Sequence, residues 1–264
     1  MADLEYSLSD GVATLTMNRP EARNALSMEM RSMLSDKLHD CESDPEVRCV
    51  VLKGKGSQFM DGGEVKRFED NDGVTKEQAH KMFLHRIHDL HTIMFAMRRM
   101  PKPILASVAG AAAGAGVSIA MACDLVIAAD SAFFTLAYVN IGTSPDGSST
   151  YFLPKTVHLK RALEMALLGD RYTAEQAREM GMVNWVVPAD QLEAETDKLA
   201  KRLASGPTRA MGNAKQLLYA SYENHFEKQL QMEAERFADS ATGPDFMEGV
   251  MAFVQKRKPN FSGK

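Results

Sequence analysis

Cysteines and blocks of basic residues are both scarce in this chain. Its 264 residues include three cysteines, an odd number without the paired spacing of a zinc site or a redox motif. We therefore expect reduced thiols rather than a disulfide framework, and no bound metal. The formal net charge is −4 and no basic block occurs, which argues against nucleic acid as a partner.

Strongly hydrophobic segments of membrane-spanning length are lacking as well. Residues 103–123 carry no charge and are long enough to cross a bilayer, but they are mostly Gly and Ala rather than Leu, Ile and Phe. Residues 1–6 lack the basic and apolar segments of an export signal. These features predict a cytoplasmic protein that does not associate with a membrane.

The chain opens with alternating strand and helix patterns. Residues 4–8 and 12–17 alternate in polarity around Asp10 and Gly11, which predicts a hairpin, and Ser27 is placed to cap a following helix. Later apolar runs predict buried strands, and helical spacing predicts a long helix and several shorter ones. The expected strands lie at 47–52, 104–108, 125–129, 132–136 and 181–188, and the expected helices at 75–100, 161–168 and from 173.

A change in composition divides the chain. Beyond residue 191 the strand patterns stop and only helical ones follow, with Gly-Pro breaks at 206 and 243. The sequence therefore predicts an α/β core over residues 1–199 and an appended helical region over residues 200–264.

Two glycine-rich loops are candidates for a ligand site. Residues 108–124 hold glycines at 110, 114 and 116 among alanines, and a helix starting near Gly116 would leave its first N–H groups free for an anion. The alternative is close packing between elements, which also needs small residues. The second loop, 54–64, has Phe59 as an apolar anchor and a flexible Gly62-Gly63 pair; an ordinary surface turn is its alternative.

Few side chains outside these loops point to chemistry. Pro145 and Asp146 are expected in the first turn of a helix, where the dipole favours a carboxylate, so Asp146 either caps that helix or serves a reaction. Histidines cluster in the predicted helix over 75–100, where His85 and His88 are expected to face solvent. The histidines of this helix are His80, His85, His88 and His91.

Taken in order, these segments resemble the crotonase superfamily, the enoyl-CoA hydratase/isomerase enzymes. The likeness runs through five motifs over nearly the whole chain, at 18–26 (NRPEARNAL), 59–64 (FMDGGE), 110–124, 161–184 and 248–261 (EGVMAFVQKRKPNF). The resemblance implies a spiral of ββα units, a C-terminal helical region that forms a homotrimer or a dimer of trimers, and an acyl-CoA thioester as substrate.

The resemblance also implies a backbone oxyanion hole made by the N–H groups of Gly63 and Ala115. Such a hole suits a thioester, because deprotonation at Cα moves negative charge onto the thioester oxygen. The two glutamates of the family's hydratases have Ser118 and Tyr138 as counterparts here, so the two-glutamate mechanism is not available. Asp146 aligns with an aspartate found in family members that dehalogenate 4-chlorobenzoyl-CoA or isomerise ring-epoxidised phenylacetyl-CoA.

The same resemblance implies a set of binding residues. Ala22 and Arg23 are expected near the nucleotide of coenzyme A, and Glu64 and Val65 near its pantetheine arm. Tyr138 is expected at the substrate. Two residues of the helical region are expected to reach the coenzyme A of a neighbouring subunit, Phe237 and Lys256.

One carboxylate suffices to move a double bond. Asp146 would take a proton from C2 of a 3-enoyl-CoA and return it at C4, giving a 2-enoyl-CoA with no cofactor beyond the coenzyme A of the substrate. We therefore expect an acyl-CoA isomerase. The alternatives are a hydratase that uses Asp146 in place of the glutamates, and a non-catalytic acyl-CoA binding protein.

Overall fold

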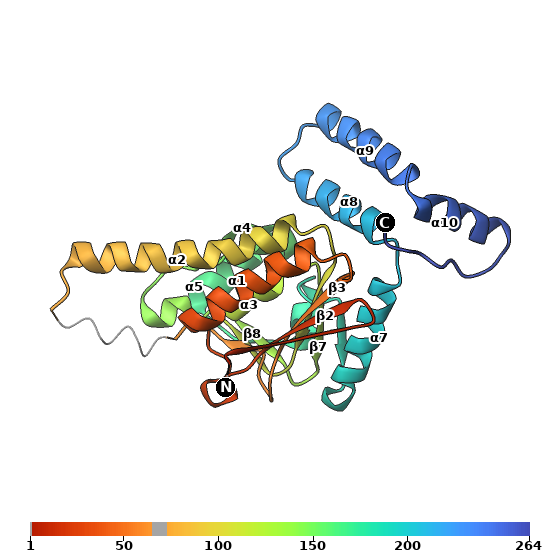
Figure 1. Ribbon diagram of the computed structural model, residues 1–264. Helices are drawn as coiled ribbons and strands as arrows, with labels where there is room; N and C mark the ends of the chain where they lie inside the picture. Colours follow the sequence, from red (N-terminus) through yellow and green to blue (C-terminus); the bar gives the residue numbers. More distant parts are fainter. Residues whose placement is uncertain (1, 65–72) are drawn as a thin grey trace.

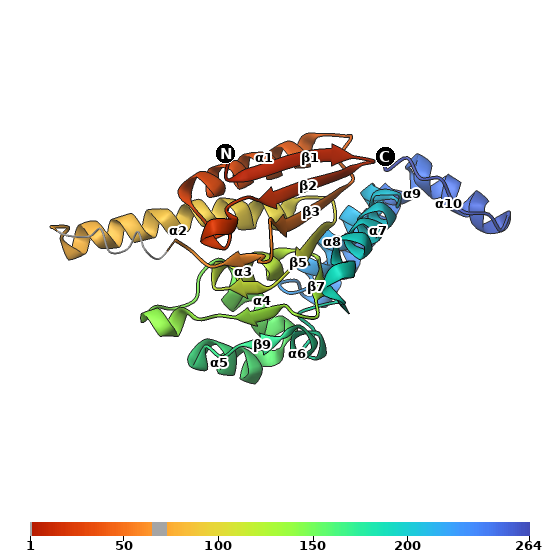
Figure 2. The ribbon, with the colours of Figure 1, turned by 90° about the horizontal axis from the view of Figure 1, so that it is seen from below.

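The structure is a computed structural model that describes residues 2–64 and 73–264. Two sheets form its centre (Figures 1 and 2). The larger has the strand order β1-β2-β3-β5-β7-β10, formed by Leu4–Ser9, Val12–Met17, Cys49–Gly54, Ile104–Val108, Leu125–Ala129 and Trp185–Val187. The smaller has the order β4-β6-β8-β9, formed by Met60–Asp61, Ala111–Ala113, Phe133–Thr135 and Tyr172–Thr173.

Helices fill the connections and the C-terminal part of the chain. The α-helices are α1 Met28–Ser43, α2 Lys76–Arg99, α3 Ala115–Ala122, α4 Ser149–Thr156, α5 His158–Leu168, α6 Ala174–Glu179, α7 Leu192–Ala204, α8 Thr208–Ala220, α9 Phe226–Ala241 and α10 Pro244–Val254. The short 3-10 helices are η1 Pro20–Ala22, η3 Tyr138–Ile141 and η4 Ala189–Gln191.

The chain repeats one pattern three times. Each repeat gives one strand to the large sheet, the next strand to the small sheet, and then a helix: β3-β4-α2, β5-β6-α3 and β7-β8 followed by α4. Within each sheet the strands of successive repeats pair in parallel. This arrangement confirms the predicted spiral of ββα units.

Local sequence signals explain where many elements begin and end. Asp10 and Gly11 adopt positive φ in the turn between β1 and β2, as a tight hairpin requires. The Ser27 hydroxyl accepts a hydrogen bond from the Met30 amide at 3.0 Å and caps α1. Thr75 caps α2 through a reciprocal capping box. The predicted hairpin, cap and long helix are therefore confirmed.

The alanine- and glycine-rich run at 103–123 is interior structure. It forms β5, β6 and α3, and most of its residues are buried. In the described part of the chain, no helix has the length and hydropathy to cross a membrane.

The helical end of the chain separates from the sheets. In Figure 1, α9 and α10 project away from the body that contains both sheets. Helix α7 spans the predicted boundary at residues 199 and 200 and contacts β3, β5 and β7. The division into residues 1–199 and 200–264 therefore stays a prediction.

A buried ion pair joins α8 to the core. The Lys215 ammonium lies 2.8 Å from the Asp124 carboxylate, and the two side chains are 7% and 17% exposed. The backbone amide of Ile104 and the hydroxyl of Tyr219 also donate to Asp124, at 2.8 Å and 3.2 Å. Burial raises the pKa of Asp124, and Lys215 opposes that shift. The pair therefore holds α8, the helix that precedes the projecting α9 and α10, against the end of α3.

Replacing Lys215 by Met should destabilise the protein by about 3–5 kcal/mol, because it leaves the Asp124 carboxylate buried without its cation. The double variant Asp124→Asn/Lys215→Met should regain much of that loss, because it buries no charge. Urea denaturation at one fixed protein concentration measures both. A single variant as stable as the double variant would contradict the assignment.

Candidate active site

Two parallel strands deliver two backbone amides to one place. In the small sheet Asp61 pairs with Ala113, where β4 and β6 end. Gly63 and Ala115 each lie two residues beyond those paired positions. Both line a cleft of about 930 Å³. The strand register therefore brings together the two amides predicted to form the oxyanion hole.

Glycines make this approach possible. A Cβ at Gly116 would lie 2.4 Å from the carbonyl oxygen of Met60, so only glycine lets the start of α3 lie against β4. Gly114 precedes α3 with a φ of +49°, which side chains disfavour. The predicted helix near Gly116 is thus confirmed, and close packing and site geometry are both served by the same small residues.

Both amides are available to a ligand. Ala115 is the first residue of α3, and the first N–H groups of a helix have no acceptor within it. Among the described residues, neither the Gly63 nor the Ala115 amide donates a hydrogen bond. The positive end of the α3 dipole adds to the attraction for a developing negative charge.

The position of Asp146 differs from the sequence-based expectation. Pro145 and Asp146 do not form the first turn of a helix, because α4 begins only at Ser149. Gly147 and Ser148 have φ of +57° and +72°, and two successive left-handed residues delay the helix. Asp146 therefore lies in the loop between η3 and α4, and this loop lines the cleft.

Hydrogen bonds hold both the carboxylate and the backbone carbonyl of Asp146. The Tyr138 hydroxyl donates to its Oδ1 at 2.6 Å. Its carbonyl oxygen accepts from the hydroxyls of Ser118 at 2.9 Å and Ser149 at 3.0 Å. Burial and, after it, the charge of Asp146 raise the pKa of Tyr138, so its phenol stays neutral and donates. Ser118 and Tyr138, the counterparts of the hydratase glutamates, thus both hold Asp146.

The rest of the cleft is mainly apolar, with a few charged groups. Helix α2 contributes much of one wall through Phe83, Ile87 and Leu90. Arg31 of α1 also lines the cleft, although sequence reasoning did not single it out. The sequence holds little sign of this position. Arg31 follows the buried Met30 in α1, and the helical pattern alone does not indicate that it faces the cleft that contains Asp146.

The predicted nucleotide-binding residues lie at the rim. Ala22 ends η1 and Arg23 follows it with a φ of +50°. The Arg23 guanidinium lies 2.9 Å from the carboxylate of Asp61, which lines the cleft. The Arg23 side chain is 70% exposed, so it can turn toward a phosphate. Asp61, a departure from the usual family alanine, therefore ties the Arg23 loop to the cleft.

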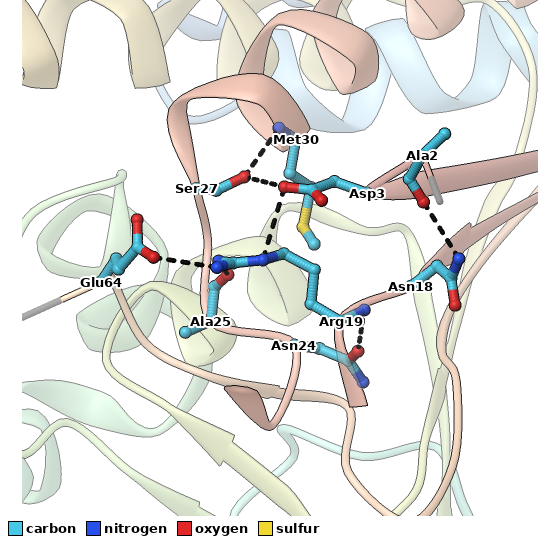
Figure 3. Close-up of polar contacts among 9 residues, drawn as sticks. All are labelled: Ala2, Asp3, Asn18, Arg19, Asn24, Ala25, Ser27, Met30 and Glu64. Carbon is cyan, nitrogen blue, oxygen red and sulfur yellow. Dashed lines mark hydrogen bonds and ion pairs between the residues drawn. The ribbon is translucent and has the colours of Figure 1, made fainter. Parts of the chain in front are cut away.

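Glu64 follows Gly63 in the chain, and Arg19 holds its side chain in place (Figure 3). Arg19 lies 2.9 Å from its Oε1 and 3.4 Å from the carboxylate of Asp3. Arg19 also donates to the carbonyl oxygen of Ala25 at 2.8 Å. Contact of Glu64 with a pantetheine arm stays a prediction. Val65 lies outside the described residues.

The remaining predicted binding residues lie on the projecting helices. Phe237 of α9 is 69% exposed and stacks edge-on with Phe246 of α10. Lys256 follows α10 and is exposed. Neither lines the cleft of its own chain. Their contact with the coenzyme A of a neighbouring subunit stays a prediction.

The histidines of α2 have different surroundings. His85 and His88 are exposed on α2, as predicted, while His91 lines the cleft. Across residues 2–64 and 73–264, no group of three or more His, Cys, Asp and Glu side chains is placed to hold a metal ion.

Residues 7–264 match the enoyl-CoA hydratase/isomerase family, and the chain belongs to that family. Its fold is the crotonase fold: an enoyl-CoA hydratase from Polaromonas sp. JS666 superposes with a TM-score of 0.92 at 33% identity, covering 98% of this chain and 99% of that one.

Relatives of known name include both activities of the family. The chain is 38% identical to 1,2-epoxyphenylacetyl-CoA isomerase of Escherichia coli over 99% of this chain and 100% of that protein. It is 32% identical to 2,3-dehydroadipyl-CoA hydratase of the same organism over the full length of both. The similarity thus establishes an enzyme family that acts on acyl-CoA thioesters.

Replacing Ala115 by Pro tests the oxyanion hole directly. Proline is tolerated at the first position of a helix but carries no N–H. We expect kcat to fall roughly 100- to 1,000-fold, the usual effect of losing one oxyanion donor. Ala115→Ser keeps the amide and should stay within a few-fold of the parent protein. A folded Ala115→Pro variant with parental activity would exclude this amide from the reaction.

Replacing Tyr138 by Phe separates positioning of Asp146 from substrate binding. Loss of a hydrogen bond to a charged group should lower kcat roughly 10- to 100-fold, with little change in KM. A raised KM at constant kcat would instead assign Tyr138 to substrate binding, as the sequence predicts. Steady-state kinetics with a 3-enoyl-CoA distinguishes the two results.

Proposed function

We propose that this protein is an acyl-CoA isomerase that converts a 3-enoyl-CoA to a 2-enoyl-CoA, with Asp146 as the acid/base. The observation that carries the proposal is the placement of the Asp146 carboxylate in the same cleft as the amides of Gly63 and Ala115. The other carboxylate of the cleft lining, Asp61, is paired with Arg23. Asp146 is therefore the better base.

The reaction needs only groups that the cleft contains. The Gly63 and Ala115 amides would bind the thioester oxygen, and Asp146 would remove a proton from C2. The dienolate places its negative charge on that oxygen, where the two amides stabilise it. Asp146 then returns the proton at C4, so no atom is gained or lost. No cofactor is required beyond the coenzyme A of the substrate.

The hydratase alternative rests on relatives that carry that name, such as 2,3-dehydroadipyl-CoA hydratase. In that reaction Asp146 would activate a water molecule for attack on C3 of a 2-enoyl-CoA. A second acid is then needed to protonate C2. Tyr138, whose proton is engaged with Asp146, would have to supply it. Isomerisation requires only Asp146 as an acid/base group.

We also propose that the protein is cytoplasmic and forms a homotrimer or a dimer of trimers. Exposed apolar side chains on α5, α9 and α10 support an interface between copies, since monomers rarely expose so many together. They include Leu159, Leu167, Phe226, Phe237 and Phe253.

Asp146→Asn should lower kcat for a 3-enoyl-CoA roughly 100- to 10,000-fold, because the amide cannot accept the proton. The control is Asp130→Asn, which removes an exposed carboxylate outside the cleft. Ultraviolet absorbance follows formation of the conjugated thioester, and mass spectrometry of the product in deuterium oxide detects solvent hydrogen at the reacting carbons.

The isotopes of water distinguish the rival functions. An isomerase shifts the double bond at unchanged mass in ordinary water and gains no oxygen from ¹⁸O-labelled water, whether Asp146 returns the same proton or first exchanges it with solvent. Incorporation of ¹⁸O would establish the hydratase instead. Tight binding of acyl-CoA without turnover of 2-enoyl or 3-enoyl thioesters, unchanged in Asp146→Asn, would establish the non-catalytic binding protein.

A further inference from the structure

The cleft lining includes the charged side chain of Arg31, which an unsubstituted alkyl chain could not hydrogen-bond. Arg31 projects from α1, next to the buried Met30, into the cleft that contains Asp146. Its Nη1 donates to the carbonyl oxygen of Arg86 in α2 at 2.8 Å. That hydrogen bond fixes one edge of the guanidinium against the helix that lines the cleft.

The other donors of Arg31 are incompletely used. Its Nε is buried, and among the described residues it has no hydrogen-bond acceptor. Burial lowers the pKa of Arg31, while the charge of Asp146 opposes that shift. A guanidinium carries five N–H donors, and a buried donor without an acceptor is unfavourable. The cleft lining therefore holds a guanidinium that makes a single hydrogen bond, through Nη1, among the described residues.

Several charged groups lie around Arg31. Asp146, Asp89 and Glu64 attract it, and Arg86 repels it. Asp146 is the strongest of these influences, but its Oδ1 already accepts from Tyr138, and no hydrogen bond joins it to Arg31 among the described residues. These charges attract the guanidinium, but among the described residues its one hydrogen bond is the one to Arg86.

We propose that Arg31 determines substrate specificity by binding an oxygen acceptor on the acyl group, so that the natural thioester carries a carboxylate or a neutral oxygen beyond its reacting carbons. An unsubstituted alkyl chain would displace water from Arg31 and supply no acceptor in return. An oxygen-bearing chain would fill the donors and still pack its carbons against Phe83, Ile87 and Leu90. The proposal rests on the acyl-CoA site of the proposed function, but not on the reaction.

Binding of saturated thioesters tests this specificity without catalysis. Calorimetry would compare succinyl-, adipoyl- and suberoyl-CoA, which end in a carboxylate, with butyryl-, hexanoyl- and octanoyl-CoA. Monomethyl esters of the same dicarboxylic thioesters provide a neutral oxygen. In the parent protein we expect at least one oxygen-bearing chain to bind roughly 10- to 100-fold more tightly than its methyl-ended match.

Variants at Arg31 assign that preference. Arg31→Met should abolish it by weakening only the oxygen-bearing ligands, and Arg31→Lys should keep it for carboxylates. A preference limited to carboxylates identifies an acidic acyl group, and one shared by the esters identifies a neutral oxygen. Equal binding of matched chains at every length by the parent protein, or equal weakening of all ligands in Arg31→Met, would overturn the proposal.

Other measurements distinguish substrate recognition by Arg31 from an effect of Arg31 on Asp146 and from a failure of the proposed function. If Arg31 acted only on Asp146, its variants would shift the pH–activity profile for all substrates alike and leave the binding preference intact, which would also overturn the proposal. If the parent protein bound no acyl-CoA at all, the proposed function itself would fail. Thermal unfolding of each variant confirms that differences in binding do not come from loss of the fold.

Discussion

The pairing of β4 with β6 is the constraint on which the site depends. These strands are only two and three residues long, yet their register decides which amides lie side by side. A shift of one residue would replace Gly63 or Ala115 by a neighbour with a differently directed N–H. Gly116 protects the register, because any Cβ there would collide with the carbonyl oxygen of Met60.

A second set of contacts holds the loop that carries Gly63. Asn24 donates to the carbonyl oxygens of Gln58 at 2.7 Å and Lys55 at 3.0 Å, while its own oxygen accepts from the Arg19 amide at 2.9 Å. Arg19 reaches onward to Glu64, next to Gly63 (Figure 3). The position of Gly63, one donor of the proposed oxyanion hole, thus rests on polar groups of residues 19–24, about 40 residues earlier in the sequence.

Sequence reasoning succeeded where one segment determines its own shape. The Asp10-Gly11 turn and the Ser27 cap each depend on residues within a few positions. It failed at Pro145 and Asp146, where a loop with left-handed residues replaced the expected helical turn. It also missed Arg31, whose role depends on packing between α1, α2 and a loop more than a hundred residues later. Pairing across such distances leaves no local pattern to detect.

Tyr138 and Ser118 both hold the carboxylate that we propose as the acid/base. Tyr138 occupies Oδ1 of Asp146, which leaves Oδ2 to take a proton. The family resemblance places Tyr138 and Ser118 at the positions of the two hydratase glutamates, and both side chains hydrogen-bond to Asp146. In the isomerase that we propose, one carboxylate fixed in this manner would carry a proton from one carbon to another, whereas a hydration route that uses two acid/base groups would need Tyr138 to give up its hydrogen bond to Asp146.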